Sequence, residues 1–217
     1  MSKLSLEYLI RPPKIEIEEP PLLVMLHGYG SNEQDLFSFA DELPEKLLII
    51  SARAPLSMDF GSYAWYSIHF NNDSKNFSDI PEAKEALLKI AKFIEEIKQE
   101  YSVNTKNVFL LGFSQGTILS TAFAINNPDK VQHVIALSGY VNKQLLIDNI
   151  ENINYSNLDF FVSHGTVDQV IPVDWARKTP DFLNNLSIQN TYHEYPVGHG
   201  VAPQNFYDLN SWIKNRL

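Results

Sequence analysis

The sequence predicts an α/β fold with a mostly parallel central sheet flanked by helices. Continuous apolar runs, such as 22–26 (LLVML), 47–50 (LLII) and 108–111 (VFLL), alternate with segments of helical spacing. Uninterrupted apolar runs are typical of strands buried on both faces, as in parallel sheets. Glycine-rich or polar turns follow these runs, so the connections have the βα character of such a sheet.

Length and composition predict one domain over residues 1–217. The 217 residues are 44% hydrophobic and 20% charged, enough for a full hydrophobic core. A net charge of −9 argues against nucleic acid as a partner and against electrostatic docking to anionic membranes. Cysteine is absent, which excludes disulfides and thiolate catalysis.

The chain shows no secretory signal and no apolar run long enough to span a bilayer. We therefore expect no stable membrane insertion and a cytoplasmic location. The sequence leaves both a monomer and a homodimer open.

The N-terminal segment is expected to contribute one or two edge strands. Residues 3–10 alternate apolar side chains and end at Pro12 and Pro13. Ile15 and Ile17 predict a second short edge strand.

The buried strand at 22–26 is expected to lead into a helix over 33–43. Ser31 or Asn32 is the candidate N-cap, and Pro44 closes the segment. The run 47–50 is the next buried strand.

Residues 52–80 form the least regular part of the chain. A long irregular stretch in a compact domain is often a lid or a pocket wall, but an ordinary surface loop anchored by aromatic side chains is an equal alternative. No large lid domain is expected. The segment contains the aromatic residues Phe60, Tyr63, Trp65, Tyr66, Phe70 and Phe77.

The most regular helical pattern covers residues 81–101. Ser78 or Asp79 is the candidate cap, and Pro81 lies in the first turn. The strand 108–111 and a helix beginning at Gln115 follow.

The C-terminal half continues the alternation of strands and helices. Strands are predicted at 131–137, 158–163 and 191–195. Residues 143–155 fit either a short helix or a loop. Helices are predicted at 172–186, with Pro180 kinking or splitting the helix, and at 203–217.

The motif GFSQG at 112–116 carries the strongest functional signal. A strand, a tight turn with a serine at its apex and a helix together form a nucleophile elbow, which exposes the serine Oγ. Gly112 and Gly116 flank the apex because side chains there would collide with the strand or the helix. A glycine-rich turn with an exposed serine is the alternative, but the strand and helix around it favour Ser114 as a nucleophile.

A serine nucleophile needs a base, and the base needs an orienting acid. Carboxyl ends of parallel strands share one edge of the sheet, so residues directly after strands meet there. Asp168 and His199 both follow predicted strands. The chain order Ser114, Asp168, His199 is the order found in α/β-hydrolases.

Other residues compete for these roles. Asp168 alone would pass as a turn residue, and Asp159 and Asp174 are rival acids. His199 combines a position after a strand, flanking glycines and the triad order. The remaining histidines are His27, His69, His133, His164 and His193.

Four segments in this order resemble the α/β-hydrolase superfamily. They are HGYGSNEQDL at 27–36, GFSQG at 112–116, HGTVDQVIP at 164–172 and GHGV at 198–201. More narrowly, the chain resembles the phospholipase/carboxylesterase family, which includes acyl-protein thioesterases and small bacterial carboxylesterases. The resemblance covers nearly the whole chain. It implies an α/β-hydrolase fold with Ser114 as nucleophile, Asp168 as acid and His199 as base.

The oxyanion hole is expected to use two backbone N–H groups. One belongs to Gln115, directly after the nucleophile, and the other to Tyr29, in the loop after the first buried strand. Acyl-protein thioesterases are expected to carry a smaller or aliphatic residue at the position of Tyr29, so its ring narrows or reshapes the acyl pocket.

The candidate substrate-binding walls have core packing as their alternative, and an aromatic-rich pocket would suit an apolar acyl or aryl group. They are Trp65, Tyr66, Phe113, Val170 and Ile171. No His/Asp/Glu cluster has metal-ligand spacing, so neither a metal nor a cofactor is expected.

The function predicted from these residues is that of a serine carboxylesterase. It would hydrolyse small-molecule acyl esters, with thioesters or lysophospholipids as further substrates, through an acyl-enzyme on Ser114. The alternatives are an acyl-protein thioesterase or an acyltransferase with the same triad. A non-catalytic binding protein on a hydrolase scaffold is a further alternative, although such proteins usually lack an intact triad.

Overall fold

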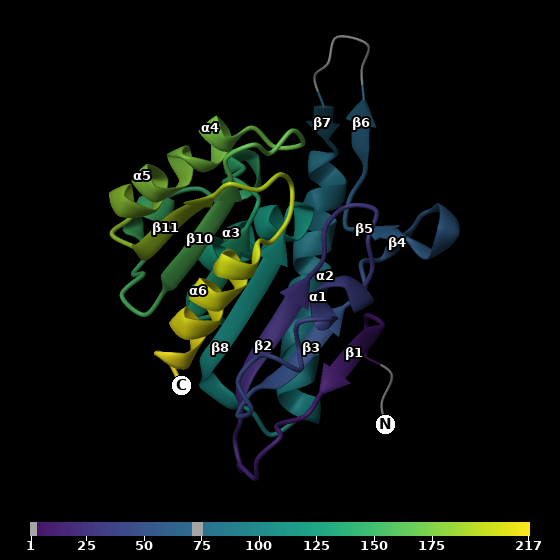
Figure 1. The fold of residues 1–217 in the computed structure, drawn as a ribbon, viewed down its shortest axis with the longest axis vertical. Helices are drawn as coiled ribbons and strands as arrows, with labels where there is room; N and C mark the ends of the chain where they lie inside the picture. The colour runs from purple at the N-terminus through teal and green to yellow at the C-terminus, as the bar shows by residue number, and fades with distance from the viewer. Residues whose placement is uncertain (1–3, 71–75) are drawn as a thin grey trace.

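The structure is a computed structural model that describes residues 4–70 and 76–217, and strands from both halves of the chain join one seven-stranded sheet (Figure 1). The strand order is β1-β3-β2-β8-β9-β10-β11. Strand β1 runs antiparallel to β3, and the other neighbours pair in parallel. The strands are β1 (Tyr8–Arg11), β2 (Pro21–Leu26), β3 (Leu48–Ala52), β8 (Asn104–Phe113), β9 (His133–Leu137), β10 (Asp159–Gly165) and β11 (Gln189–Tyr195). This is the mostly parallel sheet that the sequence predicts.

Helices cover both faces of this sheet, and two hairpins lie outside it (Figure 1). The helices are α1 (Gln34–Phe37), α2 (Ile80–Glu100), α3 (Gln115–Asn126), α4 (Val173–Ala176), α5 (Lys178–Asn185) and α6 (Pro203–Lys214). The hairpins pair β4 (Leu56–Ser57) with β5 (Tyr63–Ala64), and β6 (Ile68–Phe70) with β7 (Asn76–Ser78). Short 3₁₀ turns are η1 (Asp59–Gly61), η2 (Lys143–Leu145) and η3 (Ile150–Asn152). The irregular stretch 52–80 therefore contains both hairpins, and its residues 71–75 lie outside the described residues.

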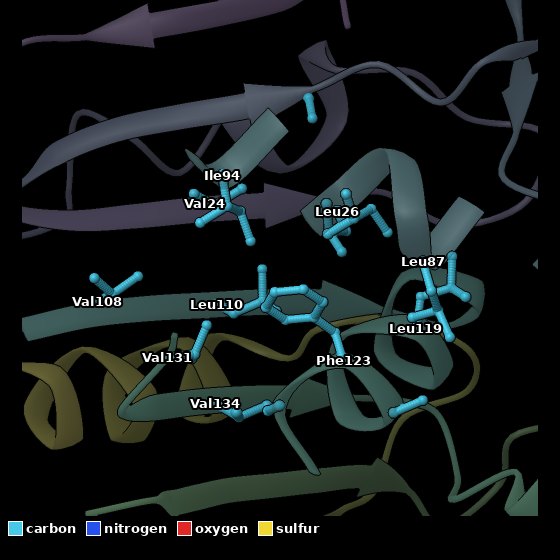
Figure 2. Packing of buried hydrophobic residues seen from close by; sticks show 14 of the residues in the cluster. Val24, Leu26, Leu87, Ile94, Val108, Leu110, Leu119, Phe123, Val131 and Val134 are labelled. Carbon is cyan, nitrogen blue, oxygen red and sulfur yellow. The ribbon is translucent and has the colours of Figure 1, made fainter. Parts of the chain in front are cut away.

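Alternating side chains of the buried strands enter two separate hydrophobic layers. Val24 belongs to the layer beneath α2 and α3, whereas Met25 belongs to the layer beneath α1 and α6. Figure 2 shows the first layer, where Val24 and Leu110 of neighbouring strands lie among helix residues such as Phe123. Burial on both faces explains why these strands have continuous apolar sequences.

The chain changes direction across the sheet between β2 and β8. After β2 it continues to α1 on one face, and after β8 it continues to α3 on the other face. The two strands are hydrogen-bonded neighbours, so their connections diverge at adjacent carboxyl ends. In open α/β sheets, the crevice at such a switch point is the usual place for a ligand.

The N-terminal prediction was right in part for the first strand and wrong for the second. Of the strand predicted over residues 3–10, only the end from Tyr8 onward is a strand, residues 4–7 lie outside it, and residue 3 lies outside the described residues. Residues 8–11 form β1, but Ile15 and Ile17 lie in no strand. Prolines at 12, 13 and 20 lack the N–H groups that a ladder needs. In this segment Lys14 donates one backbone bond to the Glu45 carbonyl, and Ile15 stays 42% exposed.

The helix predicted over 33–43 is shorter than expected. It covers Gln34–Phe37, with Asn32 Oδ1 accepting the Gln34 amide. The carbonyl of Asp35 is taken by both the amide and the hydroxyl of Ser38. This local bond competes with helix continuation, and the chain proceeds through tighter turns to residue 42.

Asp79 and Pro180 were each expected to affect a further helix, Asp79 as a cap and Pro180 by kinking or splitting it. Asp79 caps α2 by accepting the Glu82 amide, as predicted. The split predicted near Pro180 is present but falls at Arg177, between α4 and α5. Pro180 is instead the third residue of α5, where its missing N–H has no intrahelical acceptor to lose.

Candidate active site

Ser114 stands at the strained turn between β8 and α3. Its backbone has φ 54° and ψ −114°, a conformation rare for a residue with a side chain. Its amide donates to the Leu137 carbonyl at 2.9 Å, which fixes the turn to the end of β9. Such strain is typical of a functional position held by its surroundings.

The glycines on either side of Ser114 allow the close packing of this turn. A Cβ on Gly112 would lie 2.4 Å from the Gly116 carbonyl oxygen, and one on Gly116 would lie 2.0 Å from that of Leu26. Both contacts are with backbone, which cannot rotate away. The start of α3 therefore packs directly against the end of β2, as the role predicted for these glycines requires.

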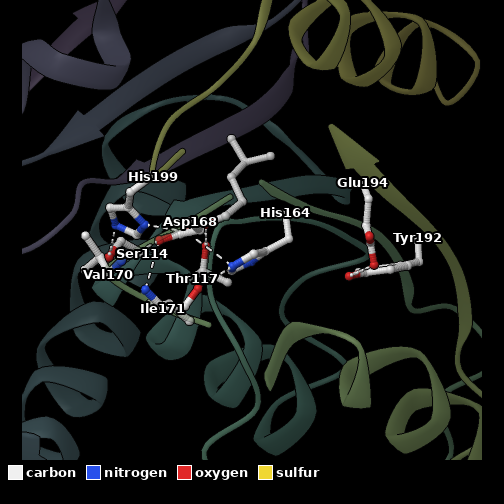
Figure 3. A network of polar contacts seen from close by, with 10 residues as sticks. Ser114, Thr117, His164, Asp168, Val170, Ile171, Tyr192, Glu194 and His199 are labelled. Atoms are coloured by element: carbon white, nitrogen blue, oxygen red, sulfur yellow. Dashed lines mark hydrogen bonds and ion pairs between the residues drawn. The ribbon is translucent and has the colours of Figure 1, made fainter. Parts of the chain in front are cut away.

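Three polar side chains from three connections meet at this edge of the sheet (Figure 3). His199 Nε2 lies 2.9 Å from Ser114 Oγ, and His199 Nδ1 lies 2.7 Å from Asp168 Oδ2. Because a carboxylate only accepts, Nδ1 carries the proton and Nε2 is left to accept from the serine hydroxyl. Asp168 follows β10 and His199 follows β11.

Asp168 is held as an anion by donors on both of its oxygens. Its Oδ1 accepts the amides of Val170 and Ile171 at 2.8 and 2.9 Å. Burial acts to raise the pKa of this carboxyl, but the hydrogen bonds from His199 and the two amides outweigh it and leave the pKa lowered. The acid is therefore ionised at neutral pH, as a partner for imidazolium must be.

The rival acids and bases have other partners. Asp159 accepts from His133 Nδ1 and from Arg216, far from Ser114 at the amino ends of the strands. Asp174 pairs with Arg177 on the surface. His193 stacks on Phe161 at 5.2 Å, and exposed His69 lies 3.5 Å from Asp79.

His27, one of the histidines that compete with His199 for the role of base, instead holds the loop after β2. Its Nδ1 donates to the Gly28 carbonyl at 2.8 Å, and its Nε2 accepts the Ala54 amide at 3.0 Å. Burial lowers its pKa, which favours this neutral tautomer. A Cβ on Gly28 would lie 3.4 Å from Ser114 Cβ, so the loop is packed against the serine.

The backbone N–H groups of residues 29–31, in the loop after β2, differ in whether they already donate a hydrogen bond. The Gly30 amide donates to Tyr63 at 2.9 Å, and the Ser31 amide donates to Gly28 at 3.3 Å. The Tyr29 amide has no hydrogen-bond partner within residues 4–70 and 76–217. Gln115 is the first residue of α3, so its amide has no intrahelical acceptor. Among the residues that the structure describes, both predicted oxyanion donors are thus free, and their role stays a prediction.

The side chain of Gln115 has a structural role that the sequence did not reveal. Its Oε1 accepts the Trp65 amide at 2.8 Å, and its Nε2 donates to the Tyr66 carbonyl at 2.7 Å. Trp65 Nε1 in turn donates to the His27 carbonyl at 2.9 Å. The stretch 65–66 therefore connects the serine turn to the loop after β2.

Two of the five predicted substrate walls do not face an open space. Trp65 and Tyr66 are each 1% exposed, and they belong to the hydrophobic core. Their aromatic rings fill that core, so we correct the prediction that they line a pocket. Of the others, Phe113 packs 5.0 Å from the His199 ring, Ile171 is buried, and Val170 is 63% exposed beside the acid.

A cavity of about 660 Å³ lies among the connections at this end of the molecule. Its aromatic walls are Tyr140, Trp175 and Phe182, and the rings of Tyr140 and Trp175 meet edge to face at 5.1 Å. The sequence offered one signal for it: Tyr140 comes directly after Ser138-Gly139, which ends a predicted strand. Trp175 gave no signal, because it looked like an ordinary helix residue.

Among residues 4–70 and 76–217, no group of three or more His, Asp or Glu side chains is arranged to hold a metal ion. None of the helices in the same residues has the length and apolar character needed to cross a bilayer.

The known proteins that this chain resembles include esterases and thioesterases. The family model described as Phospholipase/Carboxylesterase matches residues 14–217. The chain is 26% identical over 210 residues to acyl-protein thioesterase 1 of Yarrowia lipolytica, covering 90% of this chain and 91% of that protein. It is 27% identical over 208 residues to a probable carboxylesterase of Oryza sativa subsp. japonica, covering 90% and 77%.

Solved structures agree on the fold. The esterase PE8 superposes with a TM-score of 0.82 at 22% identity, covering 99% of this chain and 100% of that one. The Bacillus cereus carboxylesterase gives 0.83 at 17% identity, covering 98% and 95%. The fold is that of the α/β-hydrolases, and the match across residues 14–217 shows that this chain belongs to the phospholipase/carboxylesterase family of hydrolases.

Proposed function

We propose that this enzyme hydrolyses carboxylic esters or thioesters through an acyl-enzyme on Ser114, with His199 as general base and Asp168 as its orienting acid. The observation that carries the proposal is the continuous hydrogen-bonded line from Ser114 Oγ through both nitrogens of His199 to Asp168 Oδ2. A hydroxyl is a weak nucleophile alone, and this line gives it a base in reach.

In the first half-reaction Ser114 Oγ attacks the substrate carbonyl carbon while His199 Nε2 takes the hydroxyl proton. The tetrahedral oxyanion is stabilised by the free amides of Tyr29 and Gln115. His199 then gives the proton to the leaving alcohol or thiol, and the acyl group stays on Ser114. In the second half-reaction His199 Nε2 takes a proton from a water molecule, whose oxygen attacks the acyl carbonyl carbon. The bond to Ser114 Oγ then breaks, His199 returns the proton to Oγ, and the carboxylic acid leaves.

The substrate class is proposed as a small acyl ester rather than a nucleic acid. The net charge of −9 would repel a polyanion, which supports this choice. Relatives in the family carry both carboxylesterase and thioesterase names. The same attack on the carbonyl carbon expels either an alcohol or a thiol. Acylcholine and acylthiocholine esters of one acyl group differ only in that oxygen or sulfur atom, so they would measure the preference for esters or thioesters directly.

The aromatic cavity beside Tyr140 and Trp175 is the proposed room for the apolar part of the substrate. Gly139, the residue before Tyr140, packs near the Ser114 carbonyl, because a Cβ there would lie 3.2 Å from that oxygen. Trp175 follows Ile171 by four residues, so both walls are close in sequence to triad loops. An aromatic wall suits an acyl chain or an aryl alcohol.

The decisive experiment compares wild type with Ser114→Ala on 4-nitrophenyl esters of two to twelve carbons. We expect Ser114→Ala to lose nearly all activity, about 10⁶-fold in kcat by analogy with other serine hydrolases. A phosphonate ester that reacts with activated serines should label Ser114 in wild type, as located by peptide mass spectrometry. Hydrolysis that survives in Ser114→Ala, or labelling elsewhere, would refute the proposal.

A further inference from the structure

His164 is a buried side chain beside the triad that the mechanism above does not use. It lies near the end of β10, and its side chain is 0% exposed. Its Nε2 is 2.9 Å from the Ile171 carbonyl oxygen and 3.3 Å from Asp168 Oδ2 (Figure 3). The sequence presented it only as one of the remaining histidines that compete with His199 for the role of base.

The surroundings of the ring determine where its proton lies. Both neighbours of Nε2 are acceptors, because a carbonyl and a carboxylate oxygen cannot donate. Its Nδ1 is buried and has no hydrogen-bond partner in the described part of the chain. With its proton on Nε2, the ring donates to the Ile171 carbonyl, lies 3.3 Å from Asp168 Oδ2, and places no unpaired donor at the buried Nδ1 side.

This proton joins two parts of the acid loop. Ile171 donates its amide to Asp168 Oδ1 and accepts from His164 through its carbonyl. Asp168 Oδ2 receives His199 at 2.7 Å and His164 at 3.3 Å. The carboxylate is therefore bounded by two amides on one oxygen and two imidazoles on the other, and only one imidazole reaches the serine.

We propose that His164 is a positioning residue of the reaction, whose Nε2–H fixes the Asp168 carboxylate and the 168–171 turn so that Asp168 meets His199 in one orientation. The inference rests on the proposed function, because it assigns a role within the same triad. A carboxylate bound only by the loop's own amides could rotate with the loop. His164 ties it to a central strand of the sheet, which is rigid. The His164 Nε2–H group also stabilises part of the negative charge on Asp168 Oδ2, the oxygen that accepts from His199.

Other charged groups near His164 are already engaged. Glu194 is its register partner on β11, and that carboxylate binds Arg177 and the Tyr192 hydroxyl. Arg177 also binds Asp174. Asp168 is thus the carboxylate that His164 contacts directly in residues 4–70 and 76–217, with His199 on its far side.

The test compares His164→Leu, which has no donor, with His164→Gln, whose amide nitrogen reaches a similar position. For His164→Leu we expect kcat about 10–100-fold lower, as for a small misplacement of catalytic groups, with KM near the wild-type value. The acidic limb of its kcat/KM profile should move to higher pH, because Asp168 Oδ2 then serves His199 alone and stabilises the imidazolium more. His164→Gln should recover most of the lost kcat and the wild-type profile.

His133→Leu is the matched control. It removes a histidine that donates to an aspartate on the same sheet, but at the opposite end. We expect lower thermal stability with unchanged kcat and pH profile. The inference is wrong if folded His164→Leu behaves like wild type, or if His164→Gln is as impaired as His164→Leu, since packing alone would then explain the effect.

A measurement on the unmodified enzyme covers the case in which His164→Leu does not fold. Nitrogen-15 NMR of histidine-labelled protein, assigned with His164→Gln, should show the proton of His164 on Nε2 at pH 8. A proton on Nδ1 would overturn the inference. Loss of activity in Ser114→Ala alongside an unaffected His164→Leu would refute this inference alone, whereas activity in Ser114→Ala would refute the proposed function.

Discussion

Two histidine–aspartate pairs lie at opposite ends of the central sheet. In one, His199 Nδ1 is 2.7 Å from Asp168, and in the other, His133 Nδ1 is 2.6 Å from Asp159. Residue types, bonded atoms and distances are nearly the same. The pairs differ in what surrounds them, so they separate the contribution of the pair itself from that of its setting.

The pair at the amino ends is built by strand register. His133 and Asp159 face each other directly on β9 and β10. The His133 ring packs 4.5 Å from Phe109, and the second oxygen of Asp159 accepts from Arg216 at 2.6 Å. Aromatic packing and an arginine give this pair a structural role, and within the described part of the chain no serine or threonine hydroxyl is hydrogen-bonded to the His133 ring.

The pair at the carboxyl ends is built by loops. Asp168 and His199 follow β10 and β11, and the second nitrogen of His199 faces Ser114. Loops leave room for a substrate, but they need further contacts to hold the side chains in place. A histidine–aspartate hydrogen bond therefore serves the proposed catalysis here because of its third partner, Ser114, and because of its position at the switch point of the sheet.

The largest expected difference comes from neutralising each acid. Asp168→Asn should lower kcat about 10⁴-fold, because an amide can donate to His199 and stabilise the wrong tautomer. Asp159→Asn should leave kcat unchanged and cost about 1 kcal/mol of unfolding free energy. Ester hydrolysis and urea unfolding of both variants measure this. Equal losses of activity would show that the two pairs are not functionally distinct.

The second test concerns how the loops of the catalytic pair meet. A Cβ on Gly165 would lie 2.2 Å from the Gly198 carbonyl oxygen and 2.3 Å from that of Val197, whereas a Cβ on Gly200 meets nothing within 4 Å. Gly165→Ala should therefore push the acid and base loops apart. We expect a stability loss of about 1–3 kcal/mol from the forced contact. A displacement near 1 Å would lower kcat by about 10²-fold.

Gly200→Ala is the control for this change, because it lies next to His199 but in open space. It should keep both activity and stability close to wild type. If the two alanine variants were equally active and stable, the close approach at Gly165 would not be what assembles the pair. Enzyme assays at saturating ester and thermal unfolding give both quantities.

The pair of Asp168 and His199 could be predicted from the sequence, whereas the contacts that hold the two side chains in place could not. Ser114 follows the continuous apolar run of β8, which periodicity locates well because burial on both faces leaves few polar residues in it. Asp168 follows the shorter apolar run Phe160–Val162, whereas His199 follows the partly exposed edge strand TYHEY and was located by its glycines and the triad order. The contact of His164 with Asp168 could not be predicted, because it depends on how the buried His164 ring is oriented at the end of β10. The same holds for the Gln115 side chain, which binds backbone groups fifty residues away.

The irregular stretch 52–80 shows the limit most clearly. Its aromatic residues fit a pocket wall or a core anchor equally well by composition. The structure buries Trp65 and Tyr66 and exposes Phe60 fully at a hairpin tip. Which aromatic ring turns inward depends on tertiary contacts such as the bond from Trp65 to His27, and short-range patterns contain no record of them.

A smaller effect should appear in the acid stability of the fold. The pKa of Asp168 is lowered from its ordinary 3.8: burial opposes this, and the bonds from His199 and two amides exceed it. A carboxyl with a depressed folded pKa stabilises the fold above its unfolded pKa, and this contribution is lost as the pH falls through the lower folded value. The stability gap between wild type and Asp168→Asn should therefore shrink below about pH 4. Urea unfolding between pH 6 and pH 2.5 tests this, and a gap independent of pH would contradict it.

The smallest expected effect comes from the remote pair, through Arg216. Its Nε donates to Asp159 at 2.6 Å, and its guanidinium carbon lies 3.5 Å from the centre of the Trp212 ring. Both partners are partly exposed, so the ion pair contributes modestly, and Arg216→Met keeps most of the aliphatic stem over the ring. We expect a loss of about 1 kcal/mol in unfolding free energy with no change in kcat. Arg216 binds the second oxygen of Asp159, as two backbone amides bind the second oxygen of Asp168. A fall in kcat in Arg216→Met would mean that the pair of His133 and Asp159 influences the distant triad, and the two pairs could then no longer be treated as independent.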